Sequence, residues 1–246
     1  MNIKLIIKNG IEKLMASRGY SIIRTSARQN PFTMESALQA IAKRKHCFNT
    51  VIDVGASDGR WSGSLMKHFP QCQYLLIEAQ QVHEKALRQF SSAHNNVQFV
   101  LAAAGEMSGK IYFDAADPFG GQASYTPYAA NNIQIAATTI NQEVRSKKLA
   151  GPYLIKLDTH GFEVPILKGA SQILAETEVI IMECYNFKIT PECLLFFEMC
   201  DLMKKFGFRC IDLADPLRRP HDESLWQIDL IFVKDNRPEF LYLDYQ

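Results

Sequence analysis

The chain has 246 residues, of which 47% are apolar, and its 27 basic and 26 acidic side chains give a formal net charge of +1. The length and apolar content suffice for one sizeable α/β core. A charge so close to zero excludes the long-range positive field that nucleic-acid-binding proteins usually carry, so we expect no nucleic-acid partner. The six cysteines form no CxxC pair, which favours reduced thiols and a cytoplasmic location.

The N-terminal residues predict two helices. From Ile3 to Met15, apolar residues recur at helical spacing with lysines between them. Such a helix usually packs on its own core or on a second copy of the chain, as in a homodimer, although a membrane surface is an alternative. A second helix is predicted over residues 34–45, with Thr33 as its N-cap. We therefore divide the chain into an N-terminal helical extension, residues 1–47, and a domain that spans residues 48–246.

Strands and helices alternate from residue 48 onward, which indicates a parallel sheet with crossover helices. The predicted buried strands span residues 51–54, 74–77, 97–101, 153–157 and 179–182. The predicted helices span about residues 60–68, 81–91, 141–149 and 161–175. Two short strands, over 110–114 and 133–139, flank residues 117–128, which read as a loop whose glycines and aromatic residues suit an adaptable lid.

The last third of the chain has a different order of elements. An amphipathic helix over residues 191–206 precedes two strands, over 208–213 and 227–233, that are joined by a loop and are therefore expected to be antiparallel. Five parallel strands followed by an antiparallel pair is the layout of the class I methyltransferase sheet. The fold expected is thus α/β, with a Rossmann-like seven-stranded sheet and helices on both of its faces.

Residues 51–59, VIDVGASDG, combine an apolar strand with a glycine loop that opens a helix. Gly55 and Gly59 let the backbone turn tightly and approach a ligand. The next strand ends in Glu78, about 20 residues beyond the glycines, where such folds place the carboxylate that holds ribose hydroxyls. This arrangement predicts a nucleoside cofactor.

Four sequence blocks resemble the FkbM-type S-adenosylmethionine-dependent methyltransferases. They are VIDVGASDG at 51–59, LIEAQ at 76–80, LIKLDTHGFEVPILKGA at 154–170 and VIIMECYNF at 179–187. The resemblance covers about residues 48–235 and implies S-adenosylmethionine as the cofactor. It also implies O-methylation of a small-molecule or glycan acceptor, such as a glycan, a glycolipid precursor or a polyketide-like metabolite.

The resemblance also assigns the cofactor site. It implies that Asp53, Gly55 and Gly59 shape the pocket around the methionine part of the cofactor, and that Glu78 binds the ribose. Physically, Asp53 could accept a hydrogen bond from the cofactor's ammonium group. Small residues at the end of the third strand would let the adenine lie close to the backbone. The predicted cofactor-binding residues are Asp53, Gly55, Ala56, Gly59, Glu78, Ala79 and Ala103.

The block DTHGFE, residues 158–163, lies at the strand edge where open α/β sheets bind ligands, so we expect the acceptor there. Methyl transfer to a hydroxyl needs removal of a proton, and His160 is our candidate base, with Asp158 as the second catalytic residue. Family members more often read D-x-E-G-x-E, so His160 departs from the pattern and could instead hydrogen-bond Glu163. We expect no metal, although Asp158 and Glu183 could together hold a divalent cation.

Two alternative functions remain open from the sequence. An NAD(P)-dependent oxidoreductase would use a similar strand, loop and acid, but the loop here reads G-x-x-x-G and lacks the initial G-x-G of the dinucleotide fingerprint. A non-catalytic nucleoside-binding protein of the same fold is the other alternative, and His160 in place of the commoner glutamate keeps it open.

Overall fold

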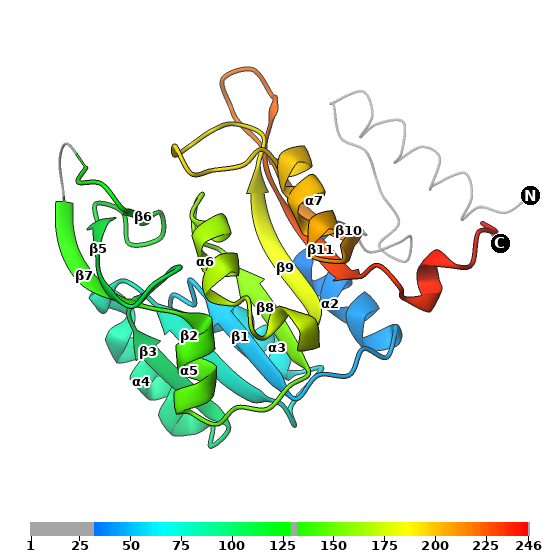
Figure 1. The fold of residues 1–246 in the computed structure, drawn as a ribbon, viewed down its shortest axis with the longest axis horizontal. Helices are drawn as coiled ribbons and strands as arrows, with labels where there is room; N and C mark the ends of the chain where they lie inside the picture. Colours follow the sequence, from blue (N-terminus) through cyan, green and yellow to red (C-terminus); the bar gives the residue numbers. More distant parts are fainter. Residues whose placement is uncertain (1–31, 129–131, 246) are drawn as a thin grey trace, which may run out of the picture. The chain divides into compact units, whose positions relative to one another are not determined.

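The computed structural model describes residues 32–128 and 132–245 (Figure 1). From Phe32 onward the chain forms one compact unit. The amphipathic helix predicted from Ile3 to Met15 lies outside the described residues. Within the described residues, no helix has the length and apolar character needed to cross a membrane.

The main sheet of the described residues has seven strands in the order β10-β11-β9-β8-β1-β2-β3. The five strands from β9 to β3 are mutually parallel, whereas β11 runs antiparallel to both β9 and β10. This is the predicted arrangement, with its antiparallel C-terminal pair. The strands are β1 Thr50–Val54, β2 Gln73–Glu78, β3 Val97–Leu101, β8 Tyr153–Leu157, β9 Thr177–Tyr185, β10 Phe208–Arg218 and β11 Leu225–Lys234.

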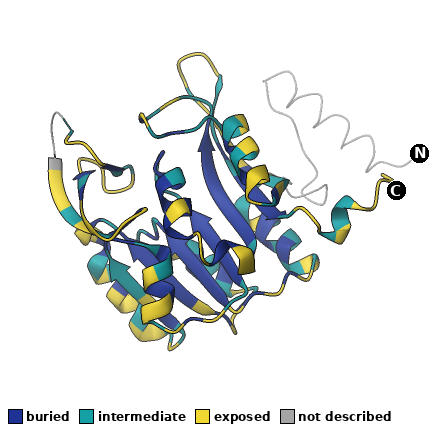
Figure 2. Cartoon of the chain, in the orientation of Figure 1, coloured by how far each residue is buried: buried dark blue, intermediate teal, exposed yellow. Residues whose placement is uncertain are grey.

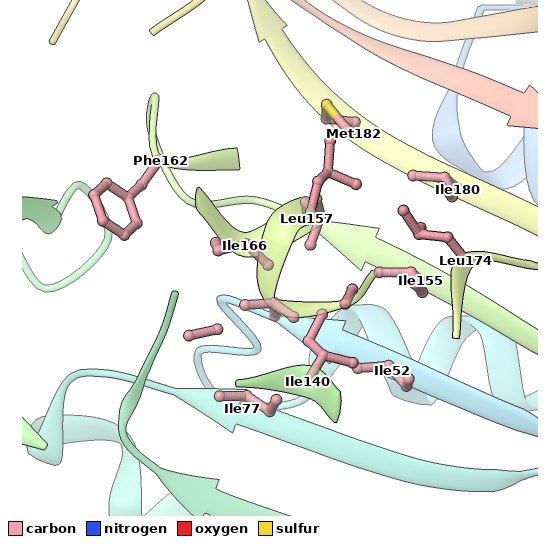
Figure 3. Close-up of a cluster of buried hydrophobic side chains, with 14 of the residues drawn as sticks. Ile52, Ile77, Ile140, Ile155, Leu157, Phe162, Ile166, Leu174, Ile180 and Met182 are labelled. Carbon is pink, nitrogen blue, oxygen red and sulfur yellow. The ribbon is translucent and has the colours of Figure 1, made fainter. Parts of the chain in front are cut away.

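Helices cover both faces of this sheet, and the central strands are buried between them (Figure 2). Alternate residues of β1 contribute to two separate cores: Ile52 packs in the cluster that contains residues of α5, α6 and α7, and Val51 in the cluster that contains residues of α2, α3 and α4. Figure 3 shows the first cluster. The helices are α2 Met34–Lys43, α3 Arg60–Met66, α4 Glu84–Ala93, α5 Ile140–Ser146, α6 Glu163–Gly169 and α7 Phe196–Lys205.

The apolar runs in the sequence explain why the central strands are predictable. Every residue of β1 and β8 is buried, and such strands read as continuous apolar runs because helices cover both of their faces. Each buried Val, Leu or Ile side chain contributes roughly 1.5–3 kcal/mol to the hydrophobic stabilisation. The sheet is therefore a rigid support for the loops at its ends.

The loop expected over residues 117–128 contains a strand, β6 Gln122–Ser124, so this prediction is wrong in part. β6 belongs to a second sheet, four-stranded within the described residues, with the order β4-β7-β5-β6. Its other strands are β4 Ala103–Ala104, β5 Gly109–Asp114 and β7 Asn132–Thr138. β6 has only three residues and pairs antiparallel with β5, so the pairing rather than a local apolar pattern makes it a strand.

Helices α6 and α7 differ most from their predicted bounds, and both are much shorter than predicted. α6 ends at Gly169, where a Cβ atom would lie 2.0 Å from the carbonyl oxygen of Gly105, and only a 3₁₀ turn, η2 Leu174–Glu176, follows it. α7 begins at Phe196 rather than residue 191, because Leu195 is still extended and forms a bridge to Tyr185. Shorter 3₁₀ turns are η1 Gln81–His83 and η3 Pro238–Phe240.

Helix α2 has the predicted N-cap, since the Thr33 hydroxyl accepts a hydrogen bond from the backbone N–H of Ser36 at 3.2 Å. Leu38 and Ile41 of this helix are buried in the core cluster that contains Val51. Helix α2 therefore packs as part of the compact unit that begins at Phe32. The boundary that we placed at residue 47 remains a proposal.

Candidate functional site

A cavity of about 380 Å³ lies at the carboxyl ends of β1, β2, β8 and β9, next to the small sheet. This is the edge at which open α/β sheets bind ligands. Residues after β1 and β2 line one part of the cavity, and residues after β8 line another. Strands β4, β5 and β6 contribute Ala103, Ala104, Phe113 and Ala123.

Glu78 ends β2 with a buried carboxylate that faces this cavity. Its Oε2 accepts a hydrogen bond from the backbone N–H of Ser57 at 2.7 Å, and its Oε1 accepts one from the backbone N–H of Gln80 at 2.7 Å. Each carboxylate oxygen has more than one lone pair, so both can accept a further hydrogen bond. Two amides thus fix a carboxylate that can bind a pair of hydroxyl groups.

Gly55 brings the loop after β1 against the end of β8. Its φ is +76°, and a Cβ atom at this position would lie 2.0 Å from the carbonyl oxygen of Asp158. Gly59 has φ +84° and is the N-cap of α3, where a Cβ atom would lie 3.1 Å from the ring of Phe90. The two glycines allow the loop to close against β8 and α4, which places Ser57 over Glu78.

Lys156 is a buried ammonium beneath the end of β8. Its Nζ lies 3.0 Å from Asp158 Oδ2 and 3.5 Å from Asp53 Oδ1. Burial alone would lower the pKa of Lys156, but the two carboxylates outweigh burial and raise it. Burial would likewise raise the pKa of Asp158, but Lys156 and then His160 lower it. Asp158 is therefore an ionised carboxylate at the wall of the cavity.

The side chain of His160, which follows β8, contacts two residues of β9 and the backbone of residue 119. Its Nδ1 lies 2.8 Å from Tyr185 Oη and 3.2 Å from Glu183 Oε2, and its Nε2 lies 2.9 Å from the carbonyl oxygen of Phe119. Burial alone would lower the pKa of His160, but the Glu183 and Asp158 carboxylates outweigh it and raise it to about 9. At neutral pH the ring is therefore an imidazolium.

Glu183 lines the cavity near the end of β9 and accepts hydrogen bonds from several donors. The hydroxyl of Tyr185 and the side-chain amide of Gln227 both donate to its carboxylate. One ligand atom from each of Asp158, His160 and Glu183 lies within 4.8 Å of the other two, which is the spacing of a group that could hold a metal ion. The three side chains that the sequence suggested for acceptor chemistry are thus brought together.

Glu163 supports the turn that carries these groups. Its Oε1 accepts hydrogen bonds from the Thr159 hydroxyl at 3.0 Å and from the backbone N–H of Gly161 at 3.1 Å. Burial raises the pKa of Glu163 to about 6. His160 makes no hydrogen bond to Glu163, so the two side chains have separate roles: Glu163 fixes the turn, and His160 faces the cavity.

Residues 53–210 match the methyltransferase FkbM domain, which is more than half of the chain. The chain belongs to the FkbM methyltransferase family. It is therefore an S-adenosylmethionine-dependent methyltransferase, as the four sequence blocks indicate. No curated protein matches the sequence at a significant level.

Similar solved structures are distant from this FkbM methyltransferase. They include Sp1610 of Streptococcus pneumoniae, a putative tRNA (m1A22) methyltransferase, at 12% identity and a TM-score of 0.45, with 85% of this chain and 72% of that chain covered. Fibrillarin of Aeropyrum pernix with natively bound S-adenosyl-L-methionine has 9% identity and a TM-score of 0.45, with 75% and 66% covered. An O-methyltransferase family protein from Burkholderia thailandensis has 11% identity and a TM-score of 0.41, with 82% and 57% covered. At these values the neighbours say nothing about the acceptor.

The residues of the cavity fit S-adenosylmethionine. Glu78 has the free lone pairs that ribose hydroxyls need, and Ala102, Ala103 and Ala104 form a wall of small side chains. Ser57 also lines the cavity, and its buried Oγ has no hydrogen-bond partner among the described residues, so a polar ligand could supply one.

Of the seven predicted cofactor residues, Gly55, Glu78, Ala79 and Ala103 line the cavity, whereas Asp53, Ala56 and Gly59 do not. Asp53 is buried, and its Oδ2 accepts a hydrogen bond from the Ser62 hydroxyl of α3 at 2.7 Å. Successive residues of a strand point to opposite faces, so the side chain of Asp53 lies under α3 and does not reach the cavity. Ala56 is buried in the core cluster that contains Val51, and Gly59 shapes the turn at the start of α3.

Both predicted catalytic residues, Asp158 and His160, line the cavity. The arrangement of His160 nevertheless disagrees with a base that is free at neutral pH. Both ring nitrogens already have partners, and a pKa of about 9 leaves the ring protonated. The Glu183 carboxylate, 3.2 Å from His160 Nδ1, is the main cause of the raised pKa.

Several residues of the site were missed by the sequence reasoning. Gln80 and Gln227 line the cavity, but isolated glutamines carry no motif. Lys156 did leave a signal, because a lysine in the middle of the otherwise apolar strand YLIKL must find a carboxylate partner when it is buried.

Proposed function

We propose that this FkbM methyltransferase transfers the methyl group to a hydroxyl of a small or medium-sized acceptor. The observation that carries the proposal is that one cavity joins the carboxylate of Glu78 to the carboxylates of Asp158 and Glu183. S-adenosylmethionine, when bound, supplies a methyl group on a sulfonium. The protein must then place an acceptor oxygen in line with that methyl group and take up the proton of the hydroxyl.

Glu78 positions the cofactor end of the reaction. Because the amides of Ser57 and Gln80 hold its two oxygens, the carboxylate is oriented before any ligand arrives. We assign the ribose hydroxyls to its remaining lone pairs, the methionine part to the loop of Gly55, and the adenine to the wall at Ala103.

Asp158 is our candidate proton acceptor in place of His160. Lys156 holds its Oδ2, and the carboxylate lines the cavity beside Glu183. An ionised carboxylate can accept the hydrogen bond of an incoming hydroxyl and then its proton. His160 keeps its proton on this assignment and fixes the position of Glu183.

The charge of the acceptor end favours an uncharged, hydroxyl-bearing acceptor. The Asp158 and Glu183 carboxylates can accept hydrogen bonds from hydroxyls, and because Lys156 and His160 are already paired with these carboxylates, neither cation is free to bind a phosphate. A glycan, a glycolipid precursor or a polyketide-like metabolite has such hydroxyls. The six free cysteines suit a reducing compartment, and we propose the cytoplasm.

The proposal is tested first by calorimetry with S-adenosylmethionine and with its demethylated product. Absence of binding at sub-millimolar concentration would defeat the proposal, and binding of NADH instead would support the oxidoreductase alternative. The second step is to screen hydroxyl, amine and RNA acceptors for release of demethylated cofactor. Release with an amine or with RNA, and with no hydroxyl compound, would overturn the O-methylation assignment.

A further inference from the structure

The backbone carbonyl oxygens of residues 117–119, at the cavity, accept hydrogen bonds from side chains. We name residues 117–121 the strap. Gln80 Nε2 donates to the carbonyl oxygens of Asp117 and Pro118, each at 2.9 Å. His83 Nε2 lies 2.8 Å from the carbonyl oxygen of Pro118, and His160 Nε2 lies 2.9 Å from that of Phe119. Because a carbonyl can only accept, both histidines must carry a proton on Nε2.

The strap fits closely over the cavity. Pro118, Phe119 and Gly121 line the cavity wall. A Cβ atom at Gly121 would lie 2.6 Å from Gln80 Nε2 and 2.6 Å from the ring of Phe113, so only glycine fits this position without displacement. The rings of His83 and Phe119 also pack together, with their centroids 5.4 Å apart.

The donors come from two sides of the cavity. Gln80 and His83 follow β2, beside the carboxylate that we assign to the ribose, whereas His160 follows β8, at the acceptor end. The strap thus spans the distance between the two ends of the site. His160 has φ +52°, a conformation that is uncommon outside glycine, and this conformation places its ring between Phe119 and Glu183.

We propose that Gln80, His83 and His160 are positioning residues that hold the strap across the cofactor cavity, so that cofactor exchange requires the strap to open. The role in exchange rests on the proposed function, because it takes S-adenosylmethionine as the occupant of the cavity. The latch itself, made by the three donors, does not depend on any ligand. The ring of His160 contacts both Phe119 of the strap and Glu183, so opening of the strap would also change the position of His160 relative to Glu183.

Each latch contact can be removed by a single substitution. His83→Phe keeps a ring against Phe119 and removes the donor. His160→Asn suits a left-handed backbone but is too short to reach Phe119, and Gln80→Glu replaces the donating amide with an acceptor. Gln81→Glu makes the same chemical change at the next residue, which is exposed and does not line the cavity, and is the matched control.

The first measurement is hydrogen exchange of peptides that cover residues 115–121, in protein without cofactor. The net strength of even a neutral hydrogen bond predicts exchange at least about 3- to 10-fold faster in each latch variant, and we expect no change in Gln81→Glu. Unchanged exchange in all three latch variants would overturn the latch, whatever the cavity binds. Thermal melting identifies a variant that fails to fold, and His83→Phe is the variant with the least disturbance.

The second measurement is the dissociation rate of demethylated cofactor by stopped-flow displacement. Dissociation about 3- to 10-fold faster in the latch variants, at an unchanged melting temperature, supports the role in exchange. Faster strap exchange with an unchanged dissociation rate would overturn that role. If the wild-type protein binds no cofactor at all, the proposed function fails, and the hydrogen-exchange result still decides whether the latch exists.

Discussion

Glu78→Gln should sharply weaken the binding of S-adenosylmethionine. The wild-type carboxylate accepts one backbone N–H on each oxygen, at 2.7 Å, so a glutamine must turn its NH₂ group toward either Ser57 N–H or Gln80 N–H. Two donors would then face each other, and the orientation of the side chain would be lost. The substitution also removes the charge from both of the hydrogen bonds that we assign to the ribose hydroxyls.

The size of the effect follows from these two hydrogen bonds. A hydrogen bond to a charged group contributes about 1.5–3 kcal/mol, so the loss of two is at most about 3–6 kcal/mol. Because such losses are not additive, we expect the lower part of this range, a rise in Kd of about 100- to 1000-fold.

Isothermal titration calorimetry measures this change directly. Glu84→Gln is the matched control, since Glu84 undergoes the same chemical change but pairs with Arg88 on α4 and does not line the cavity. Its Kd should equal that of the wild-type protein. A Kd for Glu78→Gln within threefold of wild type, in protein that melts normally, would refute the ribose assignment.

Three further predictions concern the acceptor end. Asp158→Asn should lower kcat about 100- to 10,000-fold with cofactor Kd nearly unchanged, as expected for a proton acceptor; an unchanged kcat would assign the proton to another group. Glu163→Gln should stabilise the fold above pH 6. Burial raises the pKa of Glu163 from 4.5 to about 6, so stability that is fully present below pH 4.5 is lost as pH rises through 6, by about 2 kcal/mol. Urea denaturation at pH 4 and pH 7.5 should therefore show the gain in Glu163→Gln only at the higher pH, and an equal effect at both would contradict this reasoning. Finally, Lys156 and His160 already neutralise charge on Asp158 and Glu183, so dialysis against a chelator should leave the methylation rate within twofold; a loss that Mn²⁺ restores would instead show a metal site.

The sequence predicted the parts of the fold that depend on local patterns. β1 and β8 were recognised because both are mainly apolar runs, each with one charged residue, and the predicted position of Glu78 at the end of a buried strand is the one that the structure shows. These features hold because a parallel strand must be buried on both faces and because a cofactor loop must come close to the next strand end.

Asp53 is a predicted cofactor residue that does not line the cavity in the structure. Its distance from the glycines suits the cofactor, but spacing does not reveal which face of the sheet a strand residue occupies. In the structure Asp53 is paired in register with Lys156 of β8, and the two side chains meet beneath α3. The partner is 103 positions away in the sequence, so only the folded chain could reveal it.

The role of His160 also depends on residues that are distant in sequence, and their contacts argue against the role of base that the sequence suggested. A histidine at a strand end suggests a base, but here one nitrogen faces Glu183 and the other the carbonyl of Phe119. The commoner FkbM pattern, to which this block is similar, has glutamate at this position. A glutamate could not donate to that carbonyl, and its charge would oppose Glu183. On the proposal that His160 holds the strap closed over the cavity, we interpret the histidine at this position as serving the strap, and not as a sign of lost activity.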